Sequence, residues 1–263
     1  MLIAQITDTH IKPQGVLAYG RVDTAAFLAA AIAHINRLDP RPDLVLATGD
    51  LVDAGLPEEY ARLSALLAPL TVPVYLIPGN HDAREPMRAA FPEHRYLPPT
   101  GFLQYAIEDH AVRLLALDTL TPGKGHGELC DERLDWLAAR LAETDRPTAI
   151  FMHHPPFECG IAYMDRERLN QGAAQLEAIV QRHPQVERVL CGHVHRPIQV
   201  RFAGTIASVA PSTAHQATLD LRADAPLMYS MDPPAVALHQ WRSGTGLVTH
   251  LSYIGDYDGP YPF

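Results

Sequence analysis

The sequence has little cysteine and no long apolar segment. Its three cysteines, Cys130, Cys159 and Cys191, are odd in number and lie far apart, so they predict no disulfide framework and favour a reducing compartment such as the cytoplasm. The apolar stretches are far shorter than the about 18 residues that a membrane helix needs. The N-terminal segment runs into polar residues without a basic region, which predicts a strand rather than a signal peptide. We therefore expect a cytoplasmic protein without a membrane segment.

Positive charge is also scarce. Lys and Arg number 21 against 30 Asp and Glu, which gives a formal net charge of −9. An acidic surface argues against a long basic groove, so a nucleic-acid polymer is not an expected partner. A small anionic substrate stays possible, because the local charge at a site can oppose the net charge. The residue type present in unusual number is histidine, with 14 copies.

Short apolar runs alternate with amphipathic stretches along the chain, and this alternation predicts a layered α/β domain. Strands are expected over residues 2–6, 44–47, 74–77, 105–107, 112–118, 148–152, 186–191, 200–203, 205–209, 235–241 and 247–253. Helices are expected over residues 22–38, 58–70, 84–90, 130–143 and 171–183. The last four strands look like a second β-rich set.

We expect a catalytic core over residues 1–215 and a small β-rich C-terminal extension over residues 216–263. The extension would complete the second sheet and supply a cap or contacts between subunits. Prolines at Pro233 and Pro234, and again near the end of the chain, predict a tail that is not helical.

Potential metal ligands follow five of the predicted strands. The segments are Asp8-Thr9-His10, Gly49-Asp50, Gly79-Asn80-His81-Asp82, His153-His154 and Gly192-His193-Val194-His195. Ligand sites in α/β sheets form at the carboxyl ends of the strands. Each segment alone is also typical of a turn. Five of them, all placed after apolar runs, indicate a metal site.

The candidate ligands combine nitrogen and oxygen donors without a thiolate. They are Asp8, His10, Asp50, Asn80, His153, His193 and His195. Such a set suits Mn, Fe, Co or Zn rather than an all-cysteine structural zinc site. Seven ligands are too many for one ion but suit two if a carboxylate bridges them. Two ions about 3.5–4 Å apart can clamp the attacking and leaving oxygens of a phosphoryl displacement and lower the pKa of a bound water to about 7.

These residues resemble the calcineurin-like metallophosphoesterase superfamily, in which D-x-H, G-D, G-N-H-D/E, H and G-H-x-H follow one another along the chain. The finer resemblance is to the class III cyclic nucleotide phosphodiesterases and the similar bacterial glycerophosphodiesterase. It rests on further segments: Tyr19-Gly20, Pro57-Glu58-Glu59-Tyr60, Phe151–Pro156, Met164-Asp165, Pro211–Gln216 and Leu238-His239-Gln240-Trp241.

The resemblance implies a four-layer αββα sandwich and a dinuclear site. One ion would be held by Asp8, His10, Asp50 and His195, and the second by Asp50, Asn80, His153 and His193. Asp50 would bridge both ions, and His81 would be catalytic, either stabilising the transition state or protonating the leaving oxygen. The subgroup also implies dimers or larger homo-oligomers.

The implied activity is hydrolysis of small phosphodiesters by attack of a metal-bound hydroxide. Candidate substrates are 3′,5′-cyclic nucleotides such as cAMP and glycerophosphodiesters such as glycerophosphoethanolamine. Two alternatives stay open: a phosphomonoesterase or nuclease of the same fold, and a non-catalytic module that binds a partner. The roles of Asp82, His154, His215 and Tyr19 also stay open at this stage, each being either part of the site or a packing or turn residue.

Overall fold

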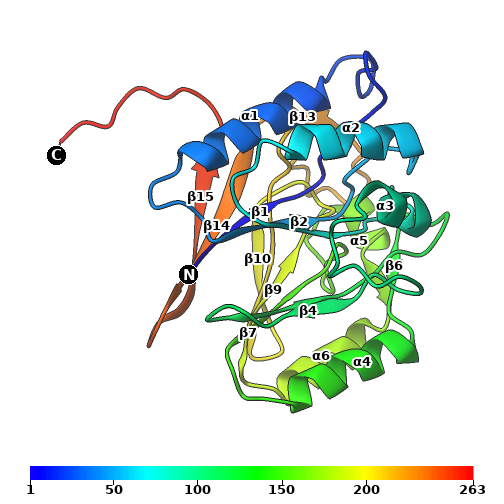
Figure 1. Cartoon of the computed structure of the whole chain (residues 1–263). Coiled ribbons are helices and arrows are strands. Elements are labelled where there is room, and N and C mark those ends of the chain that lie inside the picture. Colours follow the sequence, from blue (N-terminus) through cyan, green and yellow to red (C-terminus); the bar gives the residue numbers. More distant parts are fainter. Residues whose placement is uncertain (263) are drawn as a thin grey trace.

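Two β-sheets pack face to face in the computed structural model, which describes residues 1–262 (Figure 1). The first sheet has the strand order β15-β14-β1-β2-β3. Its parallel strands are β1 (Leu2–Ile6), β2 (Leu44–Thr48) and β3 (Val74–Ile77), and β14 (Ala235–Arg242) and β15 (Gly246–Tyr253) continue it beyond β1 in antiparallel pairing. All five strands lie within one or two residues of their predicted positions.

The second sheet has the order β10-β11-β9-β7-β5-β4. Its strands are β4 (Tyr105–Ile107), β5 (Arg113–Ala116), β7 (Thr148–Phe151), β9 (Val186–Cys191), β10 (Ile198–Phe202) and β11 (Thr205–Val209). The central strands β5, β7, β9 and β11 run parallel, and β4 and β10 close the edges in antiparallel pairing. Parallel strands that are covered on both faces read as continuous apolar runs, which is why these segments were recognisable.

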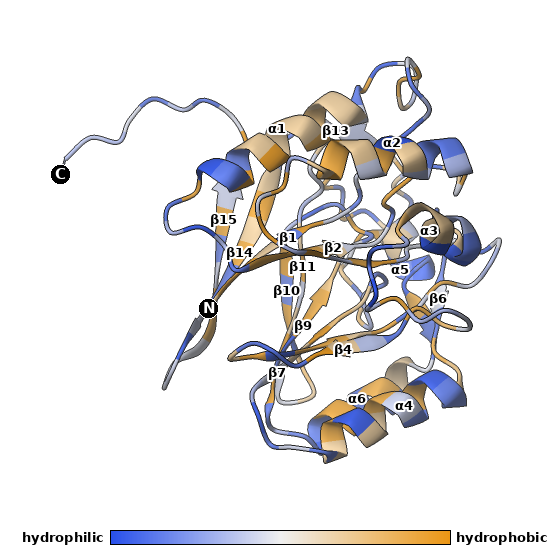
Figure 2. Cartoon of the chain, in the orientation of Figure 1, coloured by the Kyte–Doolittle hydropathy of each residue, from blue (hydrophilic) through white to orange (hydrophobic). Residues whose placement is uncertain are grey.

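Helices cover the outer face of each sheet, so the expected four-layer αββα sandwich is confirmed (Figure 1). The helices against the first sheet are α1 (Thr24–Arg37), α2 (Pro57–Leu67) and α3 (Arg84–Ala90). Those against the second are α4 (Asp131–Ala142) and α6 (Ala173–Gln181). In Figure 2, α4 carries both orange and blue residues, whereas most of α1 is pale orange, because its exposed positions include Ala26, Ala29 and Ala33.

Helix α1 shows how the local sequence builds a layer. The Asp23 side chain accepts a hydrogen bond of 3.1 Å from the backbone amide of Ala26, a cap that contributes about 0.5–2 kcal/mol to a helix. Leu28, Ile32 and Ile35 follow at helical spacing and are buried against the first sheet.

The alternation of side chains along β1 divides the core between layers. Ile3 packs between the two sheets, whereas Ala4 and Ile6 pack toward the helices. Phe151 of β7 and Leu190 of β9 reach the same inter-sheet core from the second sheet. Burying one such large side chain stabilises the fold by about 1.5–3 kcal/mol, so this core holds the two sheets at a fixed distance and fixes the edge where their strands end.

The expected second β-rich set is divided between the two sheets. Strands β10 and β11 continue the second sheet, but β14 pairs with β1 in the register Ile3↔His239 and Gln5↔Ala237. The C-terminal segment therefore extends the first sheet and does not complete the second. The hydrophobic pattern of the sequence does not specify which sheet the β14–β15 hairpin joins, because the edge strand of either sheet offers unpaired backbone groups. The boundary between core and extension at residue 215 stays a prediction.

Five short elements had no sequence signal. They are the parallel pair β6 (Gly127–Glu128) and β8 (Leu169–Gln171), the antiparallel pair β12 (Gln216–Ala217) and β13 (Tyr229–Ser230), and helix α5 (Ala162–Arg166). Segments of two to five residues are too short to show a hydrophobic period. Three of the five elements, α5, β12 and β13, contribute a residue to the wall of the pocket described below.

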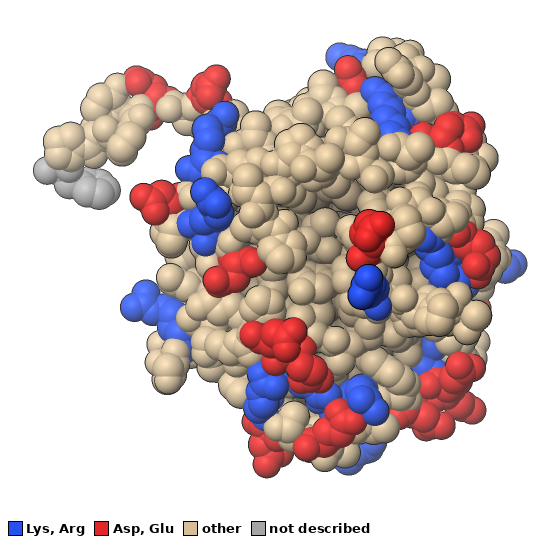
Figure 3. Space-filling model, in the orientation of Figure 1, with Lys and Arg blue, Asp and Glu red and all other residues tan. Residues whose placement is uncertain are grey.

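The surface agrees with the acidic composition. On the face drawn in Figure 3, acidic and basic side chains of the described residues are interspersed rather than gathered into one basic stripe. Within residues 1–262, none of the helices combines the length and the apolar character that a bilayer span requires. Residues 255–262 extend away from the end of β15 without helix or strand, as expected (Figure 1).

Candidate metal centre

The five strands that carry candidate ligands end at one edge of the sandwich. β1, β2 and β3 come from the first sheet and β7 and β9 from the second. Backbone hydrogen bonds join the segments beyond the strands: Asp8 N to Gly49 O at 3.0 Å, His10 N to Asp50 O at 2.9 Å, and Gly192 N to His153 O at 3.0 Å. The structure thus brings together all seven predicted ligand residues and His81.

Five of the seven candidate ligands have a left-handed backbone. Their φ angles are 54° at Asp8, 42° at His10, 48° at Asp50, 72° at His193 and 54° at His195. This conformation is uncommon outside glycine and costs about 1–3 kcal/mol for a residue held there by its surroundings. Such a concentration of strained residues at one place is typical of a functional site.

Two glycines allow the strand ends to approach one another. A Cβ atom at Gly79 would lie 2.3 Å from the backbone nitrogen of Asp50. Gly49 has a φ of 89°, and a Cβ atom there would lie 2.4 Å from Nδ1 of His153. Any larger residue at either position would push the candidate ligands apart, which explains the glycines in the Gly-Asp and Gly-Asn-His-Asp segments.

A first group of ligand atoms converges at the ends of β1 and β9. Nε2 of His10 lies 3.1 Å from Nε2 of His195. Nε2 of His195 lies 3.3 Å from a carboxylate oxygen of Asp8, and Nε2 of His10 lies 3.8 Å from Oδ2 of Asp50. All four side chains are buried or nearly so.

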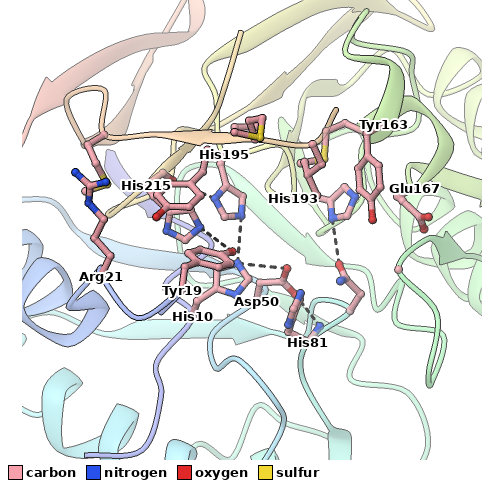
Figure 4. Close-up of a pocket in the computed structure, with 18 residues that line it drawn as sticks. His10, Tyr19, Arg21, Asp50, His81, Tyr163, Glu167, His193, His195 and His215 are labelled. Atoms are coloured by element: carbon pink, nitrogen blue, oxygen red, sulfur yellow. Dashed lines mark hydrogen bonds and ion pairs between the residues drawn. The ribbon is translucent and has the colours of Figure 1, made fainter. Parts of the chain in front are cut away.

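A second group converges next to the first. Nε2 of His153 lies 3.3 Å from Oδ2 of Asp50 and 3.2 Å from Oδ1 of Asn80. Oδ1 of Asn80 is also 3.0 Å from Nδ1 of His193. The carboxylate of Asp50 therefore faces both groups, with Oδ2 toward His10 and His153. Figure 4 shows it between His10 and His81 at the floor of the pocket.

In His153 and His195, the ring nitrogen that points away from the centre makes a hydrogen bond that fixes where the ring carries its hydrogen. Nδ1 of His153 donates to the carbonyl of Thr48 at 2.8 Å, and Nδ1 of His195 donates to the carbonyl of His215 at 3.1 Å. Because a carbonyl only accepts, Nδ1 must carry the hydrogen in both rings. The neutral rings then present the lone pair of Nε2 to the centre, which is the orientation that a metal-binding histidine adopts.

The charges of the centre shift the pKa values of its members. Burial alone would raise the pKa of the Asp50 carboxyl, but the charges of His153, His81 and His10 hold it well below its usual range. Burial alone would lower the pKa of His153, but the carboxylates of Asp50 and Asp8 and the Thr48 carbonyl raise it to about 9. The protein without ions thus keeps a proton on His153 among the oxygens of Asp50 and Asn80.

These residues fit a metal site. With neutral rings, lone pairs of His153, Asp50 and Asn80 would face one another within 3.3 Å, an arrangement that needs a proton or a cation between them. Buried Nδ1 of His10 and Nε2 of His193 have no hydrogen-bond partner among the described residues. Six of the seven candidates belong to buried groups whose ligand atoms lie within 4.8 Å of one another, and Asn80 adds an amide oxygen.

Asp82 stabilises the turn rather than a ligand histidine. Its carboxylate accepts from the backbone amides of Gly79 at 2.8 Å and Leu51 at 3.1 Å, and from the hydroxyl of Tyr60 at 2.9 Å. Of the two roles left open for Asp82, the structure shows the turn. The carboxylate joins the end of β3 to the segment that follows Asp50.

His154 belongs to the packing around the centre. Its Nδ1 lies 2.8 Å from Oγ1 of Thr119 and its Nε2 lies 3.1 Å from the carbonyl of Gly125. Although His154 lies close to His153 and His193, both of its ring nitrogens are already used. It therefore orients its neighbours.

His215 and Tyr19 lie at the rim of the centre. The ring of His215 is 4.8 Å from that of His195 between centroids, and its Nε2 lies 3.3 Å from the hydroxyl of Tyr19. His215 also orients His195 through its carbonyl. Tyr19 is 61% exposed and stacks on Tyr229 with a centroid distance of 4.7 Å.

A cavity of about 800 Å³ opens above the centre, within the range for sites of small molecules (Figure 4). Its floor holds candidate ligands and His81. Its walls come from segments without a recognised motif, and residues that the sequence pattern missed include Arg21, Tyr163, Glu167, Leu227, Tyr229 and Met231. No periodicity or spacing marks them, because they belong to loops and to the short elements around α5 and β13.

Known proteins with similar sequences are phosphoesterases, as expected for a chain with this set of metal-ligand residues. Residues 1–197 match the calcineurin-like phosphoesterase family. A probable glycerophosphodiester phosphodiesterase, GpdQ, of Arcobacter nitrofigilis is 43% identical over 264 residues and covers 100% of this chain and 97% of its own. The 3′,5′-cyclic adenosine monophosphate phosphodiesterase CpdA of Escherichia coli K12 is 31% identical over 215 residues, covering 81% of this chain and 76% of its own.

The fold has counterparts among solved structures. A dimetal phosphatase from Danio rerio superposes with a TM-score of 0.69 at 14% identity, over 97% of this chain and 99% of its own. A purple acid phosphatase from yellow lupin superposes with a TM-score of 0.67 over 91% of this chain and 49% of its own, at 16% identity. The sequence matches, together with the ligand residues at the strand ends, show that this chain belongs to the calcineurin-like phosphoesterase family.

Proposed function

We propose that this protein is a dinuclear-metal phosphodiesterase that hydrolyses small phosphodiesters. The observation that carries the proposal is the shared carboxylate of Asp50, which faces two converging groups of ligand atoms at the floor of a single pocket. A carboxylate in that position is what two neighbouring ions require.

The residues of the two groups would hold the ions. Asp8, His10, Asp50 and His195 would hold the first, and Asp50, Asn80, His153 and His193 the second. The donor set suits Fe, Mn, Zn or Co. When bound, such ions lower the pKa of water to about 7, polarise a phosphoryl oxygen and offset the negative charge of an anionic substrate.

His81 is the candidate proton donor among the chain's own residues. Its Nδ1 lies 2.6 Å from the carbonyl of Asp53, which fixes the ring and leaves Nε2 for the pocket. Its backbone amide donates to Oδ1 of Asp50 at 2.9 Å. Burial lowers the pKa of His81, but the Asp50 carboxylate and the Asp53 carbonyl outweigh it and raise the pKa above its usual value. A protonated Nε2 would donate to a phosphoryl oxygen or to the departing alkoxide.

The substrate class follows from the pocket and from the relatives. A cavity of about 800 Å³ admits a molecule of the size of a nucleotide or a glycerophosphodiester. Both sequence relatives are named as phosphodiesterases of such molecules. A probable cyclic nucleotide phosphodiesterase of Rhodopseudomonas palustris is also 37% identical over 99% of this chain, so both substrate classes are candidates.

The experiment compares diester and monoester hydrolysis on protein reconstituted in parallel with Mn, Fe, Co or Zn. We expect turnover of bis(p-nitrophenyl) phosphate to exceed that of p-nitrophenyl phosphate. Asp50→Asn should abolish it, whereas Glu177→Gln on the exposed side of α6 serves as the control for a lost carboxylate. A clear preference for the monoester would replace this proposal by a phosphomonoesterase, and inactivity with every metal would favour the non-catalytic module.

A further inference from the structure

A group of buried polar side chains crosses the core between the two sheets, which is apolar elsewhere. Gln5 of β1, Thr48 of β2 and His239 of β14 are each at most 1% exposed. Together with the half-buried Thr249 of β15 they are called the inter-sheet network here. Buried polar groups are costly unless they are satisfied by partners. None of these four side chains lines the pocket above the metal centre, so their burial needs another explanation.

The amide nitrogen of Gln5 joins three strands that carry candidate ligands. It donates to Oγ1 of Thr48 and to the carbonyl of Cys191, both at 2.9 Å. Gln5 lies on β1 three residues before Asp8, whereas Thr48 and Cys191 are the last residues of β2 and β9. The hydrogen bond to Cys191 also crosses from the first sheet to the second. One side chain thus sets the spacing of three strand ends just before their ligands.

The direction of each hydrogen bond in the network follows from this end. A carbonyl only accepts, so the nitrogen of Gln5 faces Cys191, and Oε1 of Gln5 is left to accept from Nε2 of His239 at 3.0 Å. Nδ1 of the neutral His239 then accepts from the hydroxyl of Thr249 at 2.8 Å. Nη1 of Arg188 donates to the same hydroxyl oxygen at 3.0 Å. The hairpin of β14 and β15, which lies beside β1 (Figure 1), therefore orients Gln5.

Thr48 connects Gln5 to a candidate ligand. The hydroxyl of Thr48 accepts from Gln5, and its carbonyl accepts from Nδ1 of His153 at 2.8 Å. The same carbonyl accepts from Oγ1 of Thr7 at 3.1 Å. Because the Thr48 carbonyl orients the ring of His153, a shift of this end of β2 would turn Nε2 of His153 away from Asp50.

Packing alone does not hold the network in place. A cavity of about 180 Å³ between the β14–β15 hairpin and strands β10 and β11 borders Gln5, His239 and Thr249. Ser208 also lines it, and its buried hydroxyl has no hydrogen-bond partner among the described residues. Side chains beside a cavity lack packing contacts on one side. Hydrogen bonds therefore determine where Gln5 and His239 lie.

We propose that Gln5 and His239 are positioning residues of the metal centre, which hold the ends of β1, β2 and β9 at the spacing that bound ions require. This inference rests on the metal centre of the proposed function. Neither residue would touch an ion or a substrate, and both would act through the strands. Loss of a residue that orients metal ligands lowers metal affinity by about 10–100-fold. Since Gln5 contacts the strand ends rather than the ligands, we expect the lower value.

The test measures Co²⁺ affinity by competition with a chelator, on protein first freed of metal. Gln5→Met keeps the length of the side chain but removes its donor and acceptor, so the affinity should fall about tenfold. His239→Leu leaves Oε1 of Gln5 buried without a donor and should have a similar effect. His239→Gln offers an amide donor in place of Nε2 and should restore the wild-type affinity. The absorption spectrum of bound Co²⁺, which reports the geometry of its ligands, should change in the first two variants and not in the third.

Two control variants separate positioning from a general loss of stability. His34→Leu removes a hydrogen bond of 2.7 Å between α1 and Ser252 of the same hairpin, outside the inter-sheet network. Ile107→Ala weakens the same inter-sheet core from β4, a strand that carries no candidate ligand. Both should keep the wild-type Co²⁺ affinity at a temperature at which every variant is folded.

Three outcomes would overturn the positioning role. The first is wild-type Co²⁺ affinity in both Gln5→Met and His239→Leu. The second is an equal loss of affinity in Ile107→Ala, because lower stability would then explain the effect. The third is a His239→Gln variant as weak as His239→Leu, since the donor at Nε2 would then not matter.

The binding measurement needs no turnover, so it distinguishes failure of this role from failure of the proposed function. If no diester is hydrolysed but Co²⁺ affinity changes among the variants as expected, the phosphodiesterase assignment fails and the positioning role stands. If diesters are hydrolysed and all variants bind Co²⁺ as the wild type does, only the positioning role fails.

Discussion

The buried ion pair between Asp118 and Arg84 allows a quantitative test of how the fold supports the metal centre. Asp118 follows β5 and is fully buried, and Arg84 begins α3, two residues after Asp82. Nε and Nη2 of Arg84 donate to the two oxygens of Asp118 at 2.6 and 2.8 Å. The same carboxylate accepts from the amides of Leu103 at 2.8 Å and Leu120 at 3.0 Å. It thus joins the second sheet to the start of α3.

Asp118→Asn retains the shape of the side chain but removes its charge. Removing one partner of a buried pair costs about 3–5 kcal/mol, because the other charge stays buried without compensation. Arg84 is 15% exposed and keeps a hydrogen bond of 2.6 Å to the carbonyl of Leu120. We therefore expect the lower part of that range, about 3 kcal/mol, which corresponds to a fall in Tm of about 6–12 °C for a chain of this size.

The assay is urea unfolding at pH 7, followed by circular dichroism, with the metal removed from every sample. Asp220→Asn is the matched control, because Asp220 pairs with Arg222 on the surface and the same chemical change there should not alter the midpoint. Equal midpoints for Asp118→Asn and Asp220→Asn would refute the reasoning. A double mutant that also carries Arg84→Met should recover part of the loss, since the uncompensated charge is then removed.

Three further predictions concern single residues. Burial lowers the pKa of His239 to about 3, so protonation of this histidine favours the unfolded chain. The stability that neutral His239 contributes to the folded protein is therefore complete above pH 6.5 and is lost as the pH falls from 6.5 toward 3. The pH dependence of the free energy of unfolding gives the number of protons that the chain takes up on unfolding. At pH 5 this number should be smaller by about one proton per chain in His239→Gln than in the wild type. An unchanged number would contradict this prediction. His81→Ala should lower kcat for bis(p-nitrophenyl) phosphate by about 10²–10⁴-fold while the metal content stays that of the wild type; a loss of metal would instead make His81 a structural residue. Gly79→Ala should lower metal affinity by about 10–100-fold in a competitive chelator titration, because its Cβ atom would displace the backbone of Asp50; wild-type affinity would show that the turn can relax.

The strands and the metal centre could be predicted from sequence because both depend on local pattern. Apolar runs such as Leu44–Thr48 and Val186–Cys191 are buried on both faces and therefore stand out from the polar segments around them. The candidate ligands directly follow these runs, so predicting the strands also predicted the edge at which Asp8, Asp50 and His153 meet. The distance between Asp50 Oδ2 and the two groups could not be predicted, because it depends on how the two sheets pack.

The wall of the pocket could not be predicted for a different reason. Tyr163 belongs to a five-residue helix and Glu167 directly follows it, whereas Gly125, which lies against Glu167, is 42 residues earlier in the sequence. Nothing in the spacing of these residues indicates that they meet. The edge that β14 joins was missed for a similar reason, since the contact of His239 with Gln5 at 3.0 Å links residues near opposite ends of the chain.

Homo-oligomerisation through the C-terminal region stays a prediction. Strand β15 is an edge strand of the first sheet, and Tyr257 and Tyr261 of the tail beyond it are exposed. Sedimentation of the full chain beside a variant that ends at Gly255 checks it. We expect the full chain to be a dimer or larger and the shortened chain to dissociate, and a monomeric full chain would contradict the prediction.

The two-ion assignment is tested most directly by counting metal. Protein freed of metal with a chelator and then saturated in turn with Mn, Fe, Co or Zn is passed through a desalting column, and metal per chain is measured by plasma mass spectrometry. Because Asp50 faces both groups of ligand atoms, we expect two ions per wild-type chain and fewer than one in Asp50→Ala. A stoichiometry of one ion per wild-type chain with every metal, or two ions retained in Asp50→Ala, would contradict a centre bridged by Asp50.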